Sequence, residues 1–274
     1  MRPLFVGSTV VLVALSAIEF VVLFGIIDAQ NAVGADLAYY QFVARRWLDT
    51  GVYYTASQLS GPFVVQTQVD NLYPPHALYL FVPFVYLPAI LWWLVPLGII
   101  AWVVWWCRPA VWGLPILAAI VLFPKTPNQI IYGNTDMWIA AAIAAGVRWG
   151  WPSTLVSFKP SLAFFALIGI RSRAWWIAVA GIAVASLPLL SLWLLYPTVM
   201  RNSSAQFTYS LSNLPFFCLS IVAWLTSSRR GSESMGRWFG RLAHGGAPSL
   251  ETVARECLER GQTDAREFHR LFPQ

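Results

Sequence analysis

The residues best placed to do chemistry are an aspartate and a proline-stiffened aromatic turn that follow an apolar segment. Residues 4–27 are apolar, Asp36 follows within Gly-Ala-Asp, and Asp70 precedes Asn-Leu-Tyr-Pro-Pro, which contains Tyr73. A carboxylate beside an apolar surface has a raised pKa and can act as a general base. If residues 4–27 cross a membrane, these groups lie just outside it, where a lipid-linked substrate could meet them.

Asp36 has a second interpretation as a helix cap. An aspartate just before a helix commonly accepts a hydrogen bond from a backbone N–H. Such a bond favours the ionised carboxylate, which lowers the pKa and makes a poor base. Residue type and position leave both interpretations open.

Other polar residues also have two interpretations each. His76 follows the aromatic turn and could relay a proton or be a structural histidine. Asn134, after Gly133, offers an amide that donates and accepts hydrogen bonds, or a simple loop turn. Lys159 is the only lysine within an apolar run; such a charge usually lines a cavity, although its side chain could also extend to the nearer membrane interface.

Composition indicates a polytopic membrane protein. Hydrophobic residues make up 58% of the 274 residues and charged residues 11%, and the mean hydropathy is +0.60. Residues 4–27 can cross a bilayer and exceed the apolar region of a cleavable signal, so we expect a retained anchor. The three cysteines, like the acids and histidines, lack the spacing of metal ligands. No cofactor or metal is expected.

The basic charge does not indicate a nucleic-acid partner. The net charge is +6, but eight of the basic residues lie between Arg229 and Arg270, interleaved with six acids. Arginines at the ends of apolar runs are typical of cytoplasmic loops. We therefore expect the N-terminus and the C-terminal tail to be cytoplasmic.

Apolar runs predict an all-α transmembrane bundle. Six candidate spans are 4–27, 88–107, 110–123, 137–147, 175–196 and 214–225. If the bordering arginines are cytoplasmic, 77–87 is a shallow or re-entrant helix, and 152–170 enters and returns with a pivot near Lys159 and Pro160. Complete crossings, with a few arginines outside, are the alternative.

The favoured topology places every aspartate before the tail in, or at the edge of, an outer segment: Asp28, Asp36, Asp49, Asp70 and Asp136. Acids contribute little to topology, so their clustering favours a site on the outer face. The outer loop also contains a predicted amphipathic helix from Asp36 to Gly51. It is suited to the membrane interface or to a purely structural role, and its apolar residues are Leu37, Tyr40, Ala44, Trp47 and Leu48.

Within residues 4–225, six sequence elements occur in an order that is similar to that of a known protein family. They are Asp36 with Tyr40, Ala44, Gly51 and Tyr53; Leu72-Tyr73-Pro74-Pro75; Pro83 with Leu87-Pro88; Tyr132-Gly133-Asn134-Thr135-Asp136; Phe158-Lys159-Pro160; and Tyr209-Ser210-Leu211 with Pro215. Their order resembles the GT-C membrane glycosyltransferases. It is most similar to the polyprenyl-phosphate-mannose-dependent α-mannosyltransferases of bacterial phosphatidylinositol mannoside assembly.

The resemblance implies transfer of a hexose, with mannose expected, from a polyprenyl-phosphate carrier to a hydroxyl of a lipid or glycan acceptor. The transfer would invert the anomeric carbon at the outer face of a bacterial plasma membrane, without a nucleotide sugar. Asp36 would be the general base and Lys159 the leading cation for the leaving phosphate, with Lys125, Arg45 and Arg46 as secondary candidates. Residues expected to contact substrate are Tyr40, Asp70, Tyr73, His76, Asn134, Asp136 and Lys159.

Two other classes of function stay open. Broken helices and Lys159 also suit a lipid or solute transporter. The chain is shorter than expected for the family, so a partner membrane subunit could complete the lipid groove, or the protein could be a non-catalytic subunit of a cell-envelope assembly complex. Residues 1–227 form the expected transmembrane domain. Residues 228–274 read as a linker and a short helix capped near Ser249.

Overall fold

The computed structural model describes residues 2–65, 69–204 and 212–227. They belong to the first of two units, Met1–Ser227. The expected tail helix and the Tyr209-Ser210-Leu211 element lie outside the described residues. The α-helices are α1 (Arg2–Ala29), α2 (Ala35–Thr50), α3 (Ala56–Ser60), α4 (Leu78–Phe81), α5 (Leu91–Cys107), α6 (Leu114–Leu122), α7 (Lys125–Tyr132), α8 (Asp136–Trp149), α9 (Arg173–Ser186), α10 (Leu190–Asn202) and α11 (Leu214–Leu225).

Short 3-10 helices connect these elements: η1 (Pro75–Ala77), η2 (Val82–Val85), η3 (Val111–Gly113), η4 (Trp151–Phe158), η5 (Pro160–Gly169) and η6 (Leu187–Leu189). Within the described ranges the only β-type pairings are two isolated bridges. The all-α prediction is confirmed for this part of the chain.

Two helical stretches are long and apolar enough to cross a membrane: α1, and the 30-residue stretch from Arg173 to Asn202. A third crossing results if Val111–Leu122 and Lys125–Tyr132, which meet at 56°, count as one span. Three of the six expected spans, at 88–107, 137–147 and 214–225, form helices of 17, 14 and 12 residues. These are shorter than the roughly 20 residues that cross a bilayer, so six full crossings stay a prediction.

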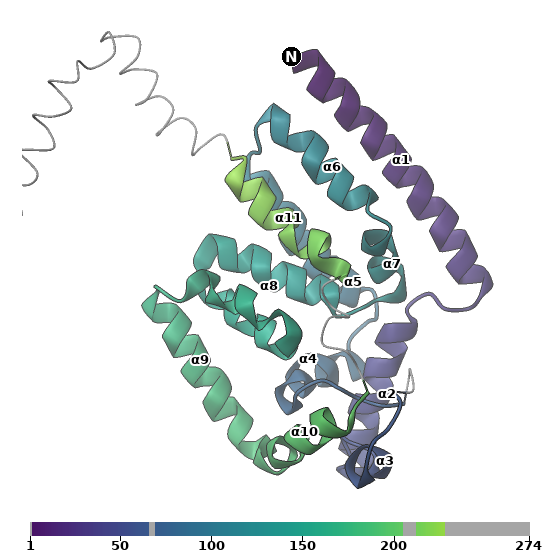
Figure 1. Cartoon of the computed structure of the whole chain (residues 1–274), viewed down its shortest axis with the longest axis vertical. Coiled ribbons are helices and arrows are strands. Elements are labelled where there is room, and N and C mark those ends of the chain that lie inside the picture. The colour runs from purple at the N-terminus through teal and green to yellow at the C-terminus, as the bar shows by residue number, and fades with distance from the viewer. Residues whose placement is uncertain (1, 66–68, 205–211, 228–274) are drawn as a thin grey trace, which may run out of the picture. The chain divides into compact units, whose positions relative to one another are not determined.

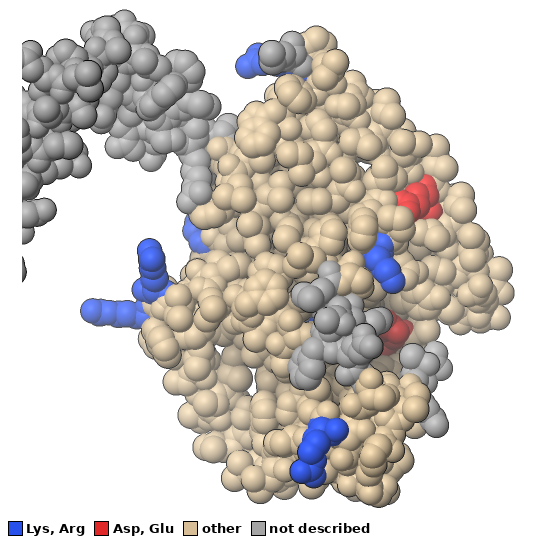
Figure 2. Space-filling view, viewed as in Figure 1, with Lys and Arg blue, Asp and Glu red and all other residues tan. Residues whose placement is uncertain are grey.

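Charged side chains are few on the face of the described residues that Figure 2 shows. Apolar side chains of α1 project outward, with Leu4 73% and Val21 70% exposed. Figure 1 shows α1 running along one edge, where it packs mainly on α6. Because exposed apolar surface of this extent is rare on soluble monomers, the structure is that of a membrane-associated helical protein.

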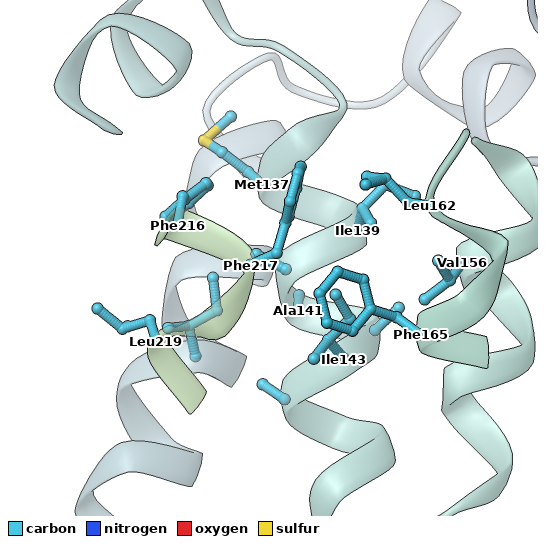
Figure 3. Close-up of a cluster of buried hydrophobic side chains, with 14 of the residues drawn as sticks. Met137, Ile139, Ala141, Ile143, Val156, Leu162, Phe165, Phe216, Phe217 and Leu219 are labelled. Atoms are coloured by element: carbon cyan, nitrogen blue, oxygen red, sulfur yellow. The ribbon is translucent and has the colours of Figure 1, made fainter. Parts of the chain in front are cut away.

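The core is built around α8, which packs against α5, α11, η4 and η5. Ten of its fourteen residues are buried. Alanines and a glycine on this helix let its neighbours approach closely. Figure 3 shows Ile139 and Ile143 of α8 meeting Phe165 of η5 and Phe217 of α11. This packing fixes the start of α8, where Asp136 lies.

The chain turns back at Lys159, as the sequence predicted. Lys159 separates η4 from η5, and these two helices pack against each other. Ser153 Oγ donates to the carbonyl of Ala166 at 2.7 Å. Pro160 favours the break because its ring restricts the backbone of Lys159 away from the helical region. The hairpin is a feature of the fold, whereas its re-entry into a membrane stays a prediction.

Helix α2 ends as expected, with Gly51 in the left-handed conformation at φ 72°. Its buried residues are Leu37, Tyr40, Val43 and Ala44. Leu48, an apolar residue of the predicted amphipathic helix, is 41% exposed. Val43 is fully buried in its place. The buried stripe therefore runs along the i, i+3, i+6 and i+7 positions from Leu37 and stops before the last turn.

Gly169 should not tolerate alanine. A Cβ atom there would lie 2.2 Å from the carbonyl oxygen of Gly150, which is backbone and cannot rotate away. We expect Gly169→Ala to destabilise the protein by about 1–3 kcal/mol or more, measured as a lowered midpoint of thermal unfolding in detergent. Gly181→Ala is the matched control. A Cβ at Gly181, within α9, meets nothing within 4 Å, so its midpoint should stay unchanged or rise slightly. Equal midpoints for the two variants would contradict the close approach.

Candidate active site

Asp36 lies in the first turn of α2, and its side chain contacts Asn134 in the turn that follows α7. The N-cap position of α2 belongs to Gly34, in the left-handed conformation at φ 71°, and no side chain caps this end. The cap interpretation of Asp36 is therefore wrong. Its carboxylate Oδ2 accepts a hydrogen bond from Asn134 Nδ2 at 2.6 Å. The side chain is half-buried.

The turn that carries Asn134 is held by two tryptophans. Helix α7 ends at Gly133 with φ 72°. Trp92 Nε1 donates to the carbonyl of Gly133, and Trp93 Nε1 donates to that of Ile130, both at 2.7 Å. Gly34 N donates to the carbonyl of Ile131 at 2.9 Å, which joins the start of α2 to α7 (Figure 1). Indole, glycine and backbone contacts together place Asn134 beside Asp36.

Asp136 and Lys159 form a buried ion pair next to this turn. Asp136 is fully buried and Lys159 is 9% exposed. Lys159 Nζ is paired with Asp136 Oδ1, and Asn213 Nδ2 donates to the other oxygen, Oδ2, at 2.6 Å. Asn134 Oδ1 accepts from the backbone N of Asp136 at 3.0 Å. One chain of contacts thus runs from Asp36 through Asn134 and Asp136 to Lys159.

Two tyrosines complete the cluster. The hydroxyl groups of Tyr40 and Tyr73 lie 3.1 Å apart, and Tyr73 OH is 2.6 Å from Thr135 Oγ1. The ring of Tyr40 stacks on that of Phe81 with centroids 4.7 Å apart. The stacking and Pro74, which directly follows Tyr73, restrict both rings. The hydroxyl groups are therefore fixed close to the Asn134 turn.

Burial raises the pKa of the Asp36 carboxyl, and the hydrogen bond from Asn134 opposes this rise. The negative charge of Asp136 raises the pKa further, while the charge of Lys159 lowers it. The net direction is upward because water is largely excluded on one side of the group. A carboxylate with a raised pKa is a better base than an exposed one, since it binds the abstracted proton more tightly.

The structure brings together six of the eight predicted site residues: Asp36, Tyr40, Tyr73, Asn134, Asp136 and Lys159. Asp70 and His76 have other neighbours. Asp70 Oδ1 accepts from Thr55 Oγ1 at 3.4 Å, and its carbonyl accepts from Tyr39 OH at 2.7 Å. His76 Nε2 is 3.2 Å from Ser157 Oγ.

The three secondary cation candidates are either bonded to backbone carbonyls or exposed. Arg46 donates to the carbonyls of Val52 and Tyr53 at 3.2 and 2.8 Å, which makes it a structural clamp of the loop after α2. Arg45 and Lys125 are exposed. Of the four predicted cations, Lys159 is the one whose charge acts on Asp36.

Two residues of the cluster had no predicted role. Thr135 stood inside a quoted motif, and its hydroxyl bridges Tyr73 and Asn134. Asn213 lies 77 positions from Asp136, its acceptor. A buried asparagine before Leu-Pro at the start of α11 gives a weak local signal, because Asn is common in turns. Only the three-dimensional packing assigns it to the site.

The arrangement places Asp36, which can act as an acid or a base, beside the buried ion pair of Asp136 and Lys159.

Within the described ranges, no three or more His, Cys, Asp or Glu side chains gather as a metal site would require. No protein-family model, curated protein or solved structure matches the chain. The fold and site therefore define a class: an all-helical membrane-associated protein with two to three candidate spans and a buried polar cluster.

Proposed function

We propose that the protein is a membrane glycosyltransferase that moves a hexose, with mannose expected, from a polyprenyl-phosphate carrier to an acceptor hydroxyl. The observation that carries the proposal is the position of Asp36: half-buried, with a raised pKa, and hydrogen-bonded to Asn134 rather than to its own helix. The motif order described above supplies the substrate class.

The proposed reaction is a single displacement. The acceptor oxygen attacks the anomeric carbon of the hexose while the bond between that carbon and the phosphate oxygen breaks. Asp36 takes the proton of the acceptor hydroxyl, and the bonding electrons leave with the polyprenyl phosphate. Attack from the face opposite the leaving group inverts the anomeric carbon. General-base catalysis of this kind contributes about 10² to 10⁴ in rate.

Lys159 is proposed to stabilise the leaving phosphate. Its ammonium group is oriented by Asp136, which is in turn held by Asn213. A fixed cation in a water-poor site stabilises developing negative charge without reorganising during the reaction. Tyr73 and Asn134 are proposed to bind sugar hydroxyls, because each presents a group that both donates and accepts.

The membrane arrangement belongs to the same proposal. A polytopic GT-C bundle in a bacterial plasma membrane would place α2 in the outer interface and both chain ends in the cytoplasm. The exposed apolar surfaces of α1 and of the 173–202 stretch support contact with lipid. The carrier, the acceptor and the bilayer are then the partners, with a further membrane subunit as an open possibility.

The donor class is tested with membranes that contain the full chain. Membranes are supplied with radiolabelled polyprenyl-phosphate mannose, polyprenyl-phosphate glucose or a nucleotide sugar, and incorporation into lipid and glycan fractions is measured. We expect incorporation from the polyprenyl donor and none above background from the nucleotide sugar. No incorporation from polyprenyl-phosphate mannose or glucose, with the protein present and folded, would favour a transporter or an assembly subunit.

Transfer should depend on pH through Asp36. The base is active only when ionised, so its raised pKa makes the rate fall with decreasing pH at a higher pH than an ordinary aspartate would give. Asn134→Ala removes the hydrogen bond that lowers this pKa, so the acidic limb should move to higher pH. The measurement is the pH profile of the transfer rate. A profile identical to that of the unaltered protein would contradict the role of Asn134.

A further inference from the structure

A hollow of about 410 Å³ lies at the end of α8 opposite Asp136. Gly146 and Val147 of α8, Ile168 of η5, Arg171 before α9, and Ile221 and Trp224 of α11 line it. Gly146 is the lining residue of α8 nearest to Asp136, and it lies ten residues, or about 15 Å, along the helix. It is therefore not part of the candidate active site.

Closely packed glycines form part of the wall. Gly150 and Gly169 also line the hollow, and a Cβ on Gly169 would collide with the backbone of Gly150. A Cβ on Gly146 would come within 2.7 Å of Ser153. Gly150 and Gly169 therefore approach each other closely, and Gly146 lies against Ser153, because none of the three carries a side chain.

The hollow has a positive and otherwise uncharged lining. Arg171 is the one ionisable side chain among the lining residues, it is exposed, and no carboxylate in the described part of the chain pairs with it. No acid occurs in the sequence from 137 to 232, which includes every lining residue. Arg148 lies nearby in the last turn of α8, over the rings of Trp106 and Trp149. An anion would meet no opposing charge here.

Apart from Ser172, the remaining side chains of the wall are apolar, and the wall adjoins a candidate span. Val147, Ile168, Ile221 and Trp224 line the hollow, and the 30-residue apolar stretch begins at Arg173. A ligand with a negatively charged headgroup and a hydrocarbon chain fits this lining, because the headgroup can bind Arg171 and the chain can pack on the apolar residues. Guanidinium groups bind phosphate through paired hydrogen bonds, which an exposed, uncompensated arginine can supply.

We propose that this hollow binds the phosphate headgroup of an anionic membrane lipid, with Arg171 as its cation. Free phosphate shares the headgroup chemistry, but the apolar wall and the adjoining span favour the lipid. The site is separate from the proposed transfer reaction, so its failure would leave the proposed function untouched.

The test measures thermal unfolding of the full chain in a neutral detergent. Short-chain phosphatidylglycerol, phosphatidylcholine or inorganic phosphate is added in increasing amounts, because a ligand of the folded state raises the unfolding midpoint. We expect phosphatidylglycerol to raise the midpoint and the other two to have little effect. Arg171→Gln should weaken the phosphatidylglycerol response about tenfold or more.

Arg173→Gln is the matched control, because it removes the same charge two positions away and does not line the hollow. It should keep the response. Ile221→Phe keeps every charge but narrows the hollow, and it should weaken the response. Equal loss in the two arginine variants, or full retention in Arg171→Gln, would overturn the site. An equal response to phosphatidylcholine or to inorganic phosphate would overturn its assignment to an anionic lipid.

Discussion

Asp36→Asn is expected to lower the rate of hexose transfer by about 10² to 10⁴-fold. Asparagine has the shape of aspartate, and its carbonyl oxygen can still accept the hydrogen bond that Asn134 donates to Asp36. It cannot take a proton from an acceptor hydroxyl. The rate is measured in membranes supplied with polyprenyl-phosphate mannose, and the amount of folded protein is measured in parallel and should be unchanged.

Asp49→Asn is the matched control for this substitution. Asp49 lies in the last turn of the same helix, and its side chain is exposed. The variant removes the same charge from the same element, so its transfer rate should stay within about twofold of the unaltered protein, as for surface substitutions in general. A similar loss in both variants would show that charge on α2, and not the position of Asp36, matters.

Lys159→Met is expected to destabilise the protein by about 3–5 kcal/mol. The side chains of Lys159 and Asp136 are 11% and 0% exposed, so the substitution leaves a buried carboxylate without its cation. Asn213 still donates to Asp136, but one neutral donor does not offset a buried negative charge. The measurement is the free energy of unfolding in mixed micelles.

Lys125→Met provides the comparison, because Lys125 is exposed and its loss should cost within about 0.5 kcal/mol. Combining Asp136→Asn with Lys159→Met should recover part of the lost stability, since no unpaired charge then stays buried. If Lys159→Met were as stable as Lys125→Met, the ion pair would not hold the core together as described.

The sequence predicts best what depends on local geometry. The helix from Asp36 to Gly51 follows from periodicity and from a glycine that can adopt positive φ, and the structure has it from Ala35 to Thr50. The return of residues 152–170 follows from the arginines that border them, and Pro160 indicates where the chain breaks, after Lys159. Leu48, which is 41% exposed, shows the limit: spacing defines an apolar face of the helix, but the neighbouring elements decide how much of that face is covered.

Contacts between distant elements could not be predicted. Asn213 joins Asp136 across 77 positions, and the pairing of Lys159 with Asp136 depends on the η4–η5 hairpin packing against α8. Adjacency in sequence also misled, because Asp70 and His76 flank the Tyr73 turn yet contact Thr55 and Ser157. Side chains on opposite sides of a tight turn point to different surroundings.

The central claim is that Asp36 takes the proton of the acceptor hydroxyl. Its most direct test is the pH dependence of the residual single-turnover transfer by Asp36→Asn. We expect the unaltered protein to slow as the pH falls through the raised pKa of Asp36, and the variant to show no such acidic limb. An acidic limb of unchanged position in the variant would mean that another group is the base and would contradict the account.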